Sequence, residues 1–468
     1  MLQKQQICSK MSNFARNFRF PTVWHMKNEI LATIAQGTLR GTEEEGMMTF
    51  YRIPYGTNAG RFHEVGAAPT WEGTRDASEP GPVFPQNKSR LSPVLGNKPG
   101  EEFQSEDAFH VNVWTPSLAG SRAVLFWIHG GAWVTGGGAL PWYRGANLAK
   151  NGDVVVVTVS YRLGALGTLN LPGVANGNMA VGDLLAALKW TKENIAAFGG
   201  DPDRMTVAGQ SAGAWYTVML SGHPEASKLF KRSIALSYPG SFTPISKERA
   251  TELAEALVEE LGCKDNPARI ADVPIADVLK AQETAPKKAA SKHHHLAPSS
   301  FLPIAGDHGV PEKLEEAVVN YSGGSKELMM GVTSEEAAAF LHKLSLPKPI
   351  YRVAVKLAGK KVFEKPTEHL LEAMNETGSK VYLYCFSWQS PKRLFGAPHC
   401  IDLPFMFGNL DDWADAPMLE GADAEKLRQL SQRLQGAVLR FVKNGSPSSE
   451  EEAWPEYCGD KEMTVVGY

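Results

Sequence analysis

The sequence contains little cysteine, no long apolar run and no block of like charge. Within its 468 residues, no window approaches the roughly 18 uninterrupted apolar residues that a membrane-spanning helix needs. Five cysteines, Cys8, Cys263, Cys385, Cys400 and Cys458, are scattered without the spacing of a zinc site or of a disulfide framework. These absences predict a protein of a reducing compartment, the cytoplasm, without a membrane span.

The charges nearly cancel, since 48 Lys and Arg face 51 Asp and Glu and leave a net charge of −3. No stretch reads as a basic face, so we expect neither a nucleic-acid partner nor recruitment to an anionic membrane. The remaining composition, 43% hydrophobic and 21% charged, is that of an ordinary globular protein with a large core.

The sequence divides into a polar start and a long structured part. Residues 1–30 lack the apolar core of a secretory signal, and we expect a flexible leader there. From about residue 110 onward, short apolar runs alternate with helical patterns. These runs are Ala123–Ile128, Val154–Val159, Met205–Val207, Ser233–Leu236, Leu328–Val332 and Val381–Phe386. Continuous apolar runs suit strands that are covered on both sides, which predicts an α/β fold with a mostly parallel central sheet and helices on both faces.

Two amphipathic segments are expected to pack against this sheet as helices. Val181–Phe198 carries apolar residues at helical spacing and stops at a Gly-Gly pair, which is typical of a crossover helix. Leu427–Phe441 repeats apolar residues every three or four positions and is followed by Gly445. Both patterns indicate structural helices.

The region from about residue 240 to 325 interrupts the alternation of strands and helices. It holds a helical pattern at Lys247–Leu261, and we interpret it as an inserted helical cap within a single domain of residues 31–468. His293, His294 and His295 lie in this region. Three adjacent residues do not converge on one ion from a regular element, so we expect a solvated loop rather than a zinc site.

One short motif concentrates the chemistry of the chain. Met205–Gly213 reads as a strand, a tight turn and a helix start, and it contains the only G-x-S-x-G of the sequence, centred on Ser211. A serine in such a turn is exposed as a nucleophile, and the glycines on either side leave room for neighbouring backbone. The Ala212 N–H, at the helix start, is placed to stabilise an oxyanion.

A glycine-rich segment precedes this motif in the order found in serine hydrolases. Trp127–Trp133 follows an apolar strand, and His129–Ala132 within it matches the H-G-G-G type of segment that supplies further oxyanion donors. A plain glycine turn would not explain both segments arriving in this order, separated by one strand and one helix. Together they favour acyl transfer.

With both segments in place, the chain resembles the type-B carboxylesterases, the family of cholinesterases and bacterial para-nitrobenzyl esterases. The likeness extends from about residue 34 to residue 456. It rests on the segments Gly37–Gly41, Ile53–Tyr55, Asn112–Pro116, Ser160–Gly164 and Asn194–Pro202. The resemblance implies an α/β-hydrolase fold and a serine carboxylesterase that works through an acyl-enzyme intermediate.

The resemblance also implies the two partners of the serine. The family's acid lies in a segment that reads Gly331–Ala337 here, where Glu336 takes the acid's place. Alanine replaces the glycine that usually ends this segment, and Glu335 offers a rival carboxylate. The family's histidine lies in a segment that reads Gly396–Gly408 here, which gives His399. The order Ser, Glu, His is that of α/β-hydrolases.

The implied site is a centre for two-step acyl transfer without metal or organic cofactor. Its catalytic residues would be Ser211 as nucleophile, His399 as base and Glu336 as supporting acid, with oxyanion donors at Gly131, Ala132 and Ala212. Candidates for lining the substrate pocket are Trp133, Trp142 and Trp215, for which a place in the core is an equal alternative. Because the base must be neutral, activity should rise through a pKa near the ordinary histidine value of ~6.5.

Several positions depart from the family pattern or carry a structural role in it. Phe84 and Ala108 stand where the family commonly has a disulfide, so no bridge is expected there. Gln210 replaces a glutamate before the nucleophile, which disfavours cationic choline esters. Glu106 and Arg162 match a buried ion pair of the family, which we expect to be structural.

Two other functions remain open at this point. A non-catalytic adhesion or binding protein on the same fold would be expected to have lost a triad residue, whereas all three are present. An amidase or carbamate hydrolase would use the same three residues and differ only in protonation of the leaving group, so it is the main alternative. Either enzymatic function implies a small-molecule ester or amide substrate.

Overall fold

The structure is a computed structural model that describes residues 28–97, 103–293, 301–322, 324–459 and 463–467. The expected leader lies outside the described residues, except that residues 28–30 already belong to the first strand. His294 and His295 also lie outside them, and His293 ends a helix. Over the described ranges, no helix is long and apolar enough to cross a bilayer, and no three His, Cys, Asp or Glu side chains are grouped as metal ligands.

One twelve-stranded sheet forms the centre of the molecule, in the order β1-β2-β3-β5-β7-β6-β10-β11-β12-β13-β14 with β4 beside β2. The strands are β1 (Asn28–Ile34), β2 (Gly37–Glu44), β3 (Met47–Pro54), β4 (Thr74–Asp76), β5 (His110–Thr115), β6 (Arg122–Ile128), β7 (Val155–Val159), β10 (Gly200–Gln210), β11 (Arg232–Leu236), β12 (Glu327–Thr333), β13 (Lys380–Phe386) and β14 (Thr464–Val466). Neighbours from β7 to β14 are parallel, and those from β1 to β7 are antiparallel. The predicted mostly parallel sheet is confirmed.

Side chains of the central strands enter two separate cores. In β7, Val155 and Val157 belong to one apolar cluster, whereas Val156 belongs to the other. Successive side chains of a strand point to opposite faces, so both faces of this sheet are covered. This explains why the central strands read as continuous apolar runs.

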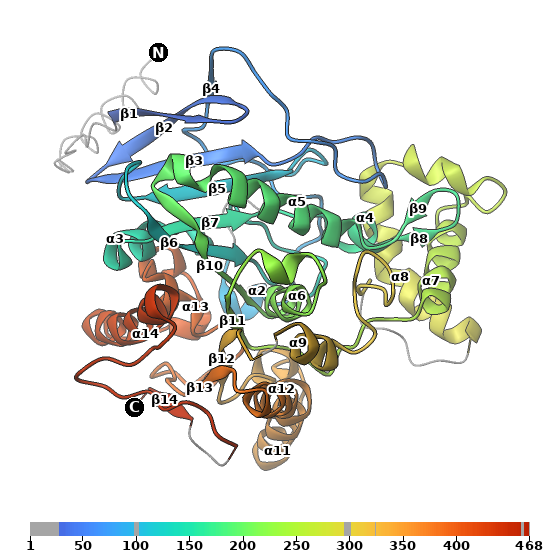
Figure 1. The fold of residues 1–468 in the computed structure, drawn as a ribbon. Coiled ribbons are helices and arrows are strands. Elements are labelled where there is room, and N and C mark those ends of the chain that lie inside the picture. The colour runs from blue at the N-terminus through green and yellow to red at the C-terminus, as the bar shows by residue number, and fades with distance from the viewer. Residues whose placement is uncertain (1–27, 98–102, 294–300, 323, 460–462, 468) are drawn as a thin grey trace, which may run out of the picture.

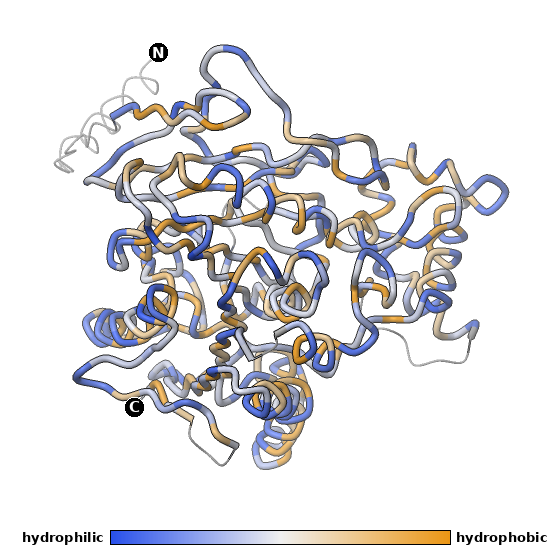
Figure 2. Tube along the Cα trace, in the orientation of Figure 1, coloured by the Kyte–Doolittle hydropathy of each residue, from blue (hydrophilic) through white to orange (hydrophobic). Residues whose placement is uncertain are grey.

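Helices cover both faces of the sheet, with hydrophobic residues turned inward and hydrophilic ones outward (Figures 1 and 2). One face is covered by α5 (Met179–Asn194) and α6 (Ala212–Ser221), and the other by α3 (Ala146–Gly152), α13 (Leu403–Phe407) and α14 (Ala424–Asn444). Shorter or peripheral helices are α2 (Ser92–Leu95), α4 (Gly164–Thr168), α10 (Ala338–Leu341), α11 (Lys348–Gly359) and α12 (Lys365–Glu376). The two helices predicted from the sequence correspond to α5 and α14.

The strands β1 to β4 lie before residue 110 and were not predicted. Their burial explains the difference, because β1 and β2 keep most of their residues partly or fully exposed. A sheet with one face in solvent needs only part of each strand to be apolar. Such strands lack the continuous apolar run by which the central strands were found.

The segment expected to form a cap contains α7 (Lys247–Glu260) and α8 (Ile275–His293), which lie to the side of the sheet in Figure 1. They pack on each other and on α4 around an apolar cluster that is separate from the two sheet cores. In contrast, α9 (Leu314–Ser322) packs against α6 beside the sheet.

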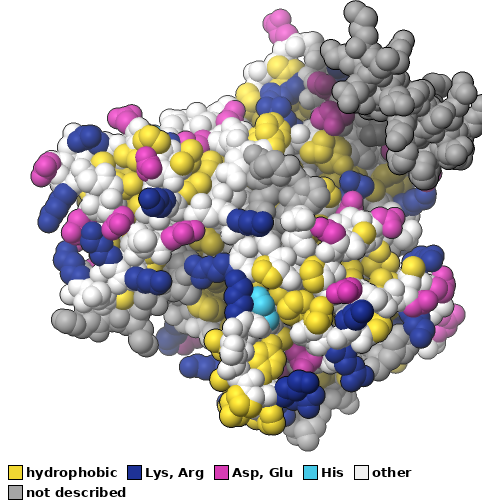
Figure 3. All heavy atoms as spheres, turned by 180° about the vertical axis from the view of Figure 1, so that it is seen from behind, with side chains coloured by type: hydrophobic (Ala, Val, Ile, Leu, Met, Phe, Trp, Pro, Cys, Tyr) yellow, Lys and Arg dark blue, Asp and Glu magenta, His cyan; other side chains and the backbone are white. Residues whose placement is uncertain are grey.

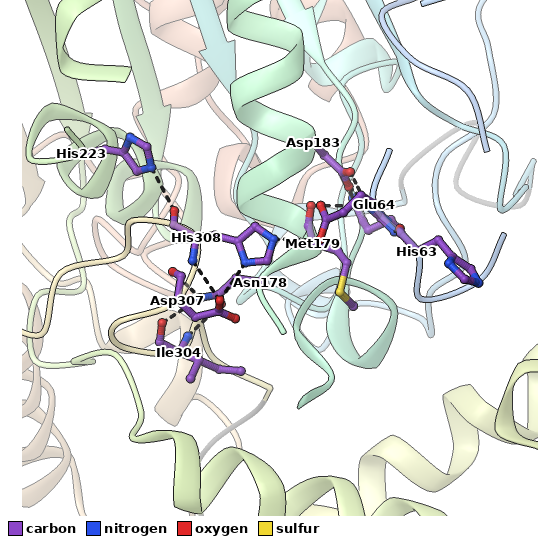
Figure 4. Close-up of polar contacts among 10 residues, drawn as sticks. His63, Glu64, Asn178, Met179, Asp183, His223, Ile304, Asp307 and His308 are labelled. Carbon is purple, nitrogen blue, oxygen red and sulfur yellow. Dashed lines mark hydrogen bonds and ion pairs between the residues drawn. The ribbon is translucent and has the colours of Figure 1, made fainter. Parts of the chain in front are cut away.

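Polar contacts fasten the return from this segment to the rest of the domain (Figure 4). Asn178 Nδ2 donates to the carbonyl oxygens of Ile304 and Asp307 at 2.7 and 3.1 Å, and Ile304 N donates back to Asn178 Oδ1 at 2.8 Å. His308 Nε2 lies 2.8 Å from Glu64 Oε1. The returning chain is thereby tied to the start of α5 and to the loop after β3.

The expected ion pair between Glu106 and Arg162 is wrong. Arg162 binds both carboxylate oxygens of Asp183 on α5, with N···O distances of 2.6 and 2.8 Å. Glu106 is bound through both oxygens by Arg61, at 2.8 and 2.5 Å. Each planar guanidinium meets a carboxylate that presents two oxygens, which is the strongest geometry for such a pair.

Candidate active site

Ser211 lies in the turn between β10 and α6, at the carboxyl end of a central strand. Its φ of 57° and ψ of −121° are a strained conformation for a residue with a side chain. A Cβ added to Gly209 would collide with the backbone of Gly213, and one added to Gly213 would collide with the carbonyl of Ile128. The G-x-S-x-G spacing therefore follows from the close approach of this turn to β6.

The turn leaves the serine side chain accessible to solvent and buries the residues on either side of it. Ser211 is partly exposed, whereas Gln210 and Ala212 are buried. Ser211 N donates to the carbonyl of Leu236 at 2.8 Å, which ties the turn to β11. Ala212 is the first residue of α6, and the N–H groups of a helix start favour nearby negative charge.

The glycine-rich segment after β6 runs beside this serine. A Cβ on Gly130 would lie 3.2 Å from Ser211 Cβ, so little more than backbone fits between them. Gly131 and Ala132 follow with φ values of 127° and 53°, and Thr135 N closes the turn by donating to Gly131 O at 3.0 Å. The structure thus places this segment next to the candidate nucleophile.

Glu336 and His399 form a buried pair in the loops that follow β12 and β13. Glu336 Oε2 lies 2.5 Å from His399 Nδ1, and Glu336 Oε1 accepts from Thr333 N at 2.8 Å. The two side chains are at most 1% exposed. With the carboxylate fixed in this way, Nδ1 carries the proton and Nε2 keeps the lone pair of the ring.

The neighbouring carboxylate, Glu335, faces a different group of donors. Its Oε2 accepts from Gln389 Nε2 at 2.8 Å and from Ala397 N at 3.0 Å. Glu335 therefore holds the loop that precedes His399, and Glu336 is the carboxylate that contacts the imidazole.

Gln210 and Cys400 surround the other nitrogen of the imidazole. Gln210 Nε2 lies 3.1 Å from His399 Nε2 and 3.1 Å from Cys400 Sγ. Because Nδ1 is bonded to Glu336, the amide N–H is the donor and Nε2 is the acceptor. The position of Gln210 before the serine was visible in the sequence, but nothing there indicated that its amide reaches the histidine. In this structure the Gln210 amide is hydrogen-bonded to the lone pair of His399 Nε2, which the Ser211 hydroxyl would need as its acceptor.

Two phenylalanine rings pack on the imidazole, and no motif in the sequence indicated either of them. The ring centroids of Phe340 and Phe363 lie 5.2 and 5.0 Å from that of His399. Phe340 belongs to α10, and Phe363 lies in the π turn Lys360–Glu364 that follows α11. Phe363 is buried, but Phe340 is 48% exposed. One apolar side of the histidine is thus separated from solvent by a single ring.

The surroundings of His399 shift its pKa in opposite directions. Burial lowers the pKa, whereas Cys400 and then Glu336 raise it, and the net shift is upward, to about 10. Asp402 is buried near them and accepts from the Tyr384 hydroxyl at 2.9 Å. Burial, followed by the charge of Glu336, raises the pKa of Asp402 to about 6. The base form of this histidine therefore requires a higher pH than the ordinary value of ~6.5 implies.

The three candidate pocket tryptophans fall into two groups on opposite faces of the sheet. Trp133 and Trp215 meet edge to face at 5.9 Å, and both contact Phe242, Trp133 through its ring and Trp215 by donating to the carbonyl at 2.6 Å. Trp142 stacks on Trp413 at 4.1 Å in the core of the other face. Its surroundings are those of a core aromatic.

Comparison with known proteins gives a consistent family assignment. A family model described as the carboxylesterase family matches residues 28–350 and 345–467. A probable N-octanoylanthranilate hydrolase from Rhodococcus erythropolis is 36% identical over 441 residues, which cover 90% of this chain and 94% of the relative. Para-nitrobenzyl esterase from Bacillus subtilis is 32% identical, covering 93% and 94%. A phenmedipham hydrolase from Pseudarthrobacter oxydans has the same identity and coverage.

Solved structures agree with this assignment over nearly the whole length. A thermophilic PNB esterase superimposes with a TM-score of 0.81 at 30% identity, covering 94% of this chain and 96% of that one. A carboxylesterase from Geobacillus stearothermophilus gives a TM-score of 0.79 at 30% identity, covering 93% and 96%. These matches confirm the α/β-hydrolase fold predicted from the sequence.

Proposed function

The chain belongs to the carboxylesterase family and hydrolyses carboxylic esters, and from this premise we propose that Ser211, His399 and Glu336 carry out the reaction. The observation that supports the proposal is the buried 2.5 Å contact between Glu336 and His399. It holds the imidazole in one tautomer and orientation, as a general base requires. Gln210 links the two parts, since it precedes the serine and its amide contacts the imidazole.

In the proposed first step, His399 Nε2 removes the Ser211 hydroxyl proton while the serine oxygen attacks the ester carbonyl. For this the imidazole exchanges the hydrogen bond from Gln210 for one from the serine. The imidazolium then protonates the departing alcohol, and the acyl group remains on Ser211. Water, deprotonated by the same nitrogen, releases the acid. Glu336 stabilises the imidazolium without taking its proton.

We propose the backbone N–H groups of Gly131, Ala132 and Ala212 as the oxyanion site. The support is the fixed left-handed backbone at the first two residues and the helix start at the third. Donors held in place before the reaction stabilise the tetrahedral oxyanion more than the neutral carbonyl, and losing one such donor costs about 10²–10³ in kcat.

Trp133 and Trp215 are proposed, together with Phe242, as an aromatic wall of the acyl pocket. They belong to the same side of the sheet as α6, and Trp215 N donates to Ser211 O at 2.9 Å. This wall favours apolar or aromatic acyl groups on small-molecule esters. We do not include Trp142, because its ring is stacked in the opposite core.

A cytoplasmic location is part of the same proposal. Its support is the sequence, in which Phe84 and Ala108 stand where the family commonly carries a disulfide. In the structure both are core residues, at 1% and 0% exposure.

The proposal is tested by covalent labelling and a matched substrate panel. A fluorophosphonate probe followed by peptide mapping should modify Ser211. Nitrophenyl esters of short and long acids should be hydrolysed much faster than the corresponding nitroanilides, and N-octanoylanthranilate extends the panel to the compound named for one relative. Labelling at another residue would refute the nucleophile assignment, and preferred turnover of anilides would favour an amidase.

A further inference from the structure

Exposed apolar side chains concentrate on one part of the surface. Twelve large hydrophobic residues are exposed among those that the structure describes, and six of them lie between residues 340 and 357. They are Phe340, Leu344, Leu346, Ile350, Val353 and Leu357, at 40–64% exposure. We call these six the apolar patch. Scattered exposed leucines are ordinary, but a contiguous group marks an interaction surface.

The helix α11 carries the centre of the patch and has two apolar faces. The inner face packs against α10 and consists of Tyr351, Val355 and Ala358. The outer face consists of Ile350, Val353 and Leu357, at 55%, 56% and 64% exposure. Residues three and four apart share one side of a helix, so these two sets point in different directions. The fold uses the inner face, and no part of the described chain covers the outer one.

Cations outnumber acidic residues around the patch, where Glu364 is the acidic neighbour of Lys356 and Lys360. Residues 337–363 contain six Lys or Arg and no Asp or Glu. The six are Lys343, Lys348, Arg352, Lys356, Lys360 and Lys361, all exposed. At the lower end of the molecule, where α11 lies in Figure 1, Figure 3 shows hydrophobic side chains with Lys and Arg beside them. The net charge of −3 for the whole chain gives no indication of this local basic segment.

We propose that the apolar patch and its cations dock the esterase on an anionic phospholipid surface. An amphipathic helix lies in a bilayer interface with its apolar side chains at the acyl boundary, while Lys and Arg attract anionic headgroups. The charge argues against two other occupants. Residues 1–27 carry five cations and no acidic residue, and a second copy would oppose the same basic surface.

The patch also adjoins the site, because Phe340 belongs to the patch and packs on His399 with ring centroids 5.2 Å apart. A docked enzyme would therefore receive amphiphilic esters of long-chain acids from the lipid phase. This substrate class rests on the proposed function, but docking does not.

Vesicle binding of the full-length protein tests the proposal. It should sediment with phosphatidylcholine vesicles that contain phosphatidylglycerol, less so at high salt, and weakly with pure phosphatidylcholine. The triple variant Lys348→Gln, Arg352→Gln, Lys356→Gln should lower the partition coefficient about 100-fold, at about fivefold for each cation lost. The triple variant Ile350→Ser, Val353→Ser, Leu357→Ser should also weaken binding. Matched controls are Lys247→Gln, Lys264→Gln, Lys280→Gln for charge and Leu31→Ser, Val465→Ser for exposed apolar area.

Each outcome separates docking from catalysis. Absence of binding to anionic vesicles, or equal binding by patch variants and controls, overturns the docking proposal. The proposal is also overturned if the wild type is a dimer in sedimentation equilibrium and the variant Ile350→Ser, Val353→Ser, Leu357→Ser is a monomer. That result would assign the patch to contact with a second copy. Turnover of a short, soluble nitrophenyl ester should be unchanged in all variants. Vesicle binding without such turnover would instead refute the proposed function.

Discussion

The serine half and the histidine half of the site are built by different physical means. At the serine, main chain meets main chain, and a methyl group on Gly209 or Gly213 would collide with backbone. At the histidine, side chains from a loop, a strand end and two helical segments meet: a carboxylate at 2.5 Å, an amide at 3.1 Å and two phenylalanine rings. Sterics specify the first half, and side-chain chemistry tunes the second. Substitutions in the serine half should therefore act by displacing backbone, and those in the histidine half by changing the tautomer and the pKa of the imidazole.

Ser211→Ala should produce the largest effect, a loss of about 10⁶ in kcat, since a serine hydrolase without its nucleophile retains little more than binding and oxyanion stabilisation. The thermal unfolding midpoint should stay close to that of the wild type, because the hydroxyl is partly exposed and adds little packing. Ester turnover and circular dichroism check both statements. Near-normal turnover in the purified variant would remove Ser211 from the reaction.

Glu336→Gln should lower kcat by about 10⁴ with little change in substrate binding, because an amide permits the wrong imidazole tautomer and does not stabilise the imidazolium. Glu335→Gln is the matched control, since its carboxylate binds Gln389 and Ala397 and not the ring. Steady-state kinetics of both variants decide between them. A large loss in Glu335→Gln alone would reverse the roles.

The same contrast explains what the sequence allowed us to predict. Strands buried on both faces and the G-x-S-x-G turn are local patterns, so β6, β7 and β11 to β13 were placed to within one residue at each end. Strand β10 was placed less well, because it begins five residues before and ends three residues after the expected run. Strands β1 and β2 were missed because most of their residues are partly or fully exposed and polar residues interrupt their apolar ones.

Contacts around the imidazole could not be predicted from the sequence, for a different reason. Gln210 and His399 are 189 residues apart and meet only because parallel strands end at the same edge of the sheet. Phe340 and Phe363 come from helices with no motif of their own. The partner of Arg162 was likewise missed, because a motif does not specify which carboxylate the fold brings to the guanidinium, here that of Asp183 on α5.

Gly131→Ala should cost about 10²–10³ in kcat by displacing oxyanion donors. An alanine there would hold an unfavourable φ of 127° and press its Cβ against the Thr135 carbonyl. The control is Gly46→Ala, where φ is 76° but nothing lies within 4 Å of the added atom. The control should lose about 1 kcal/mol of unfolding free energy and keep its turnover. Equal activity in both variants would contradict a steric origin of the serine half.

Cys400→Ala should give the smallest change, a shift of the pH profile without loss of maximal turnover. Burial lowers the pKa of His399, but Cys400 and Glu336 raise it to about 10, and the base works only when it is neutral, at pH values above its pKa. Removing the sulfur therefore lowers the pKa and moves the rising limb of kcat/KM to lower pH, by roughly one unit. Cys263→Ala, another buried cysteine, is the control and should leave the limb in place. If kcat/KM of the wild type rises with a midpoint at pH ~6.5, the surroundings do not raise the pKa of the histidine. If the wild-type midpoint lies well above that value and Cys400→Ala has the same midpoint, the upward shift of the His399 pKa comes from Glu336 alone.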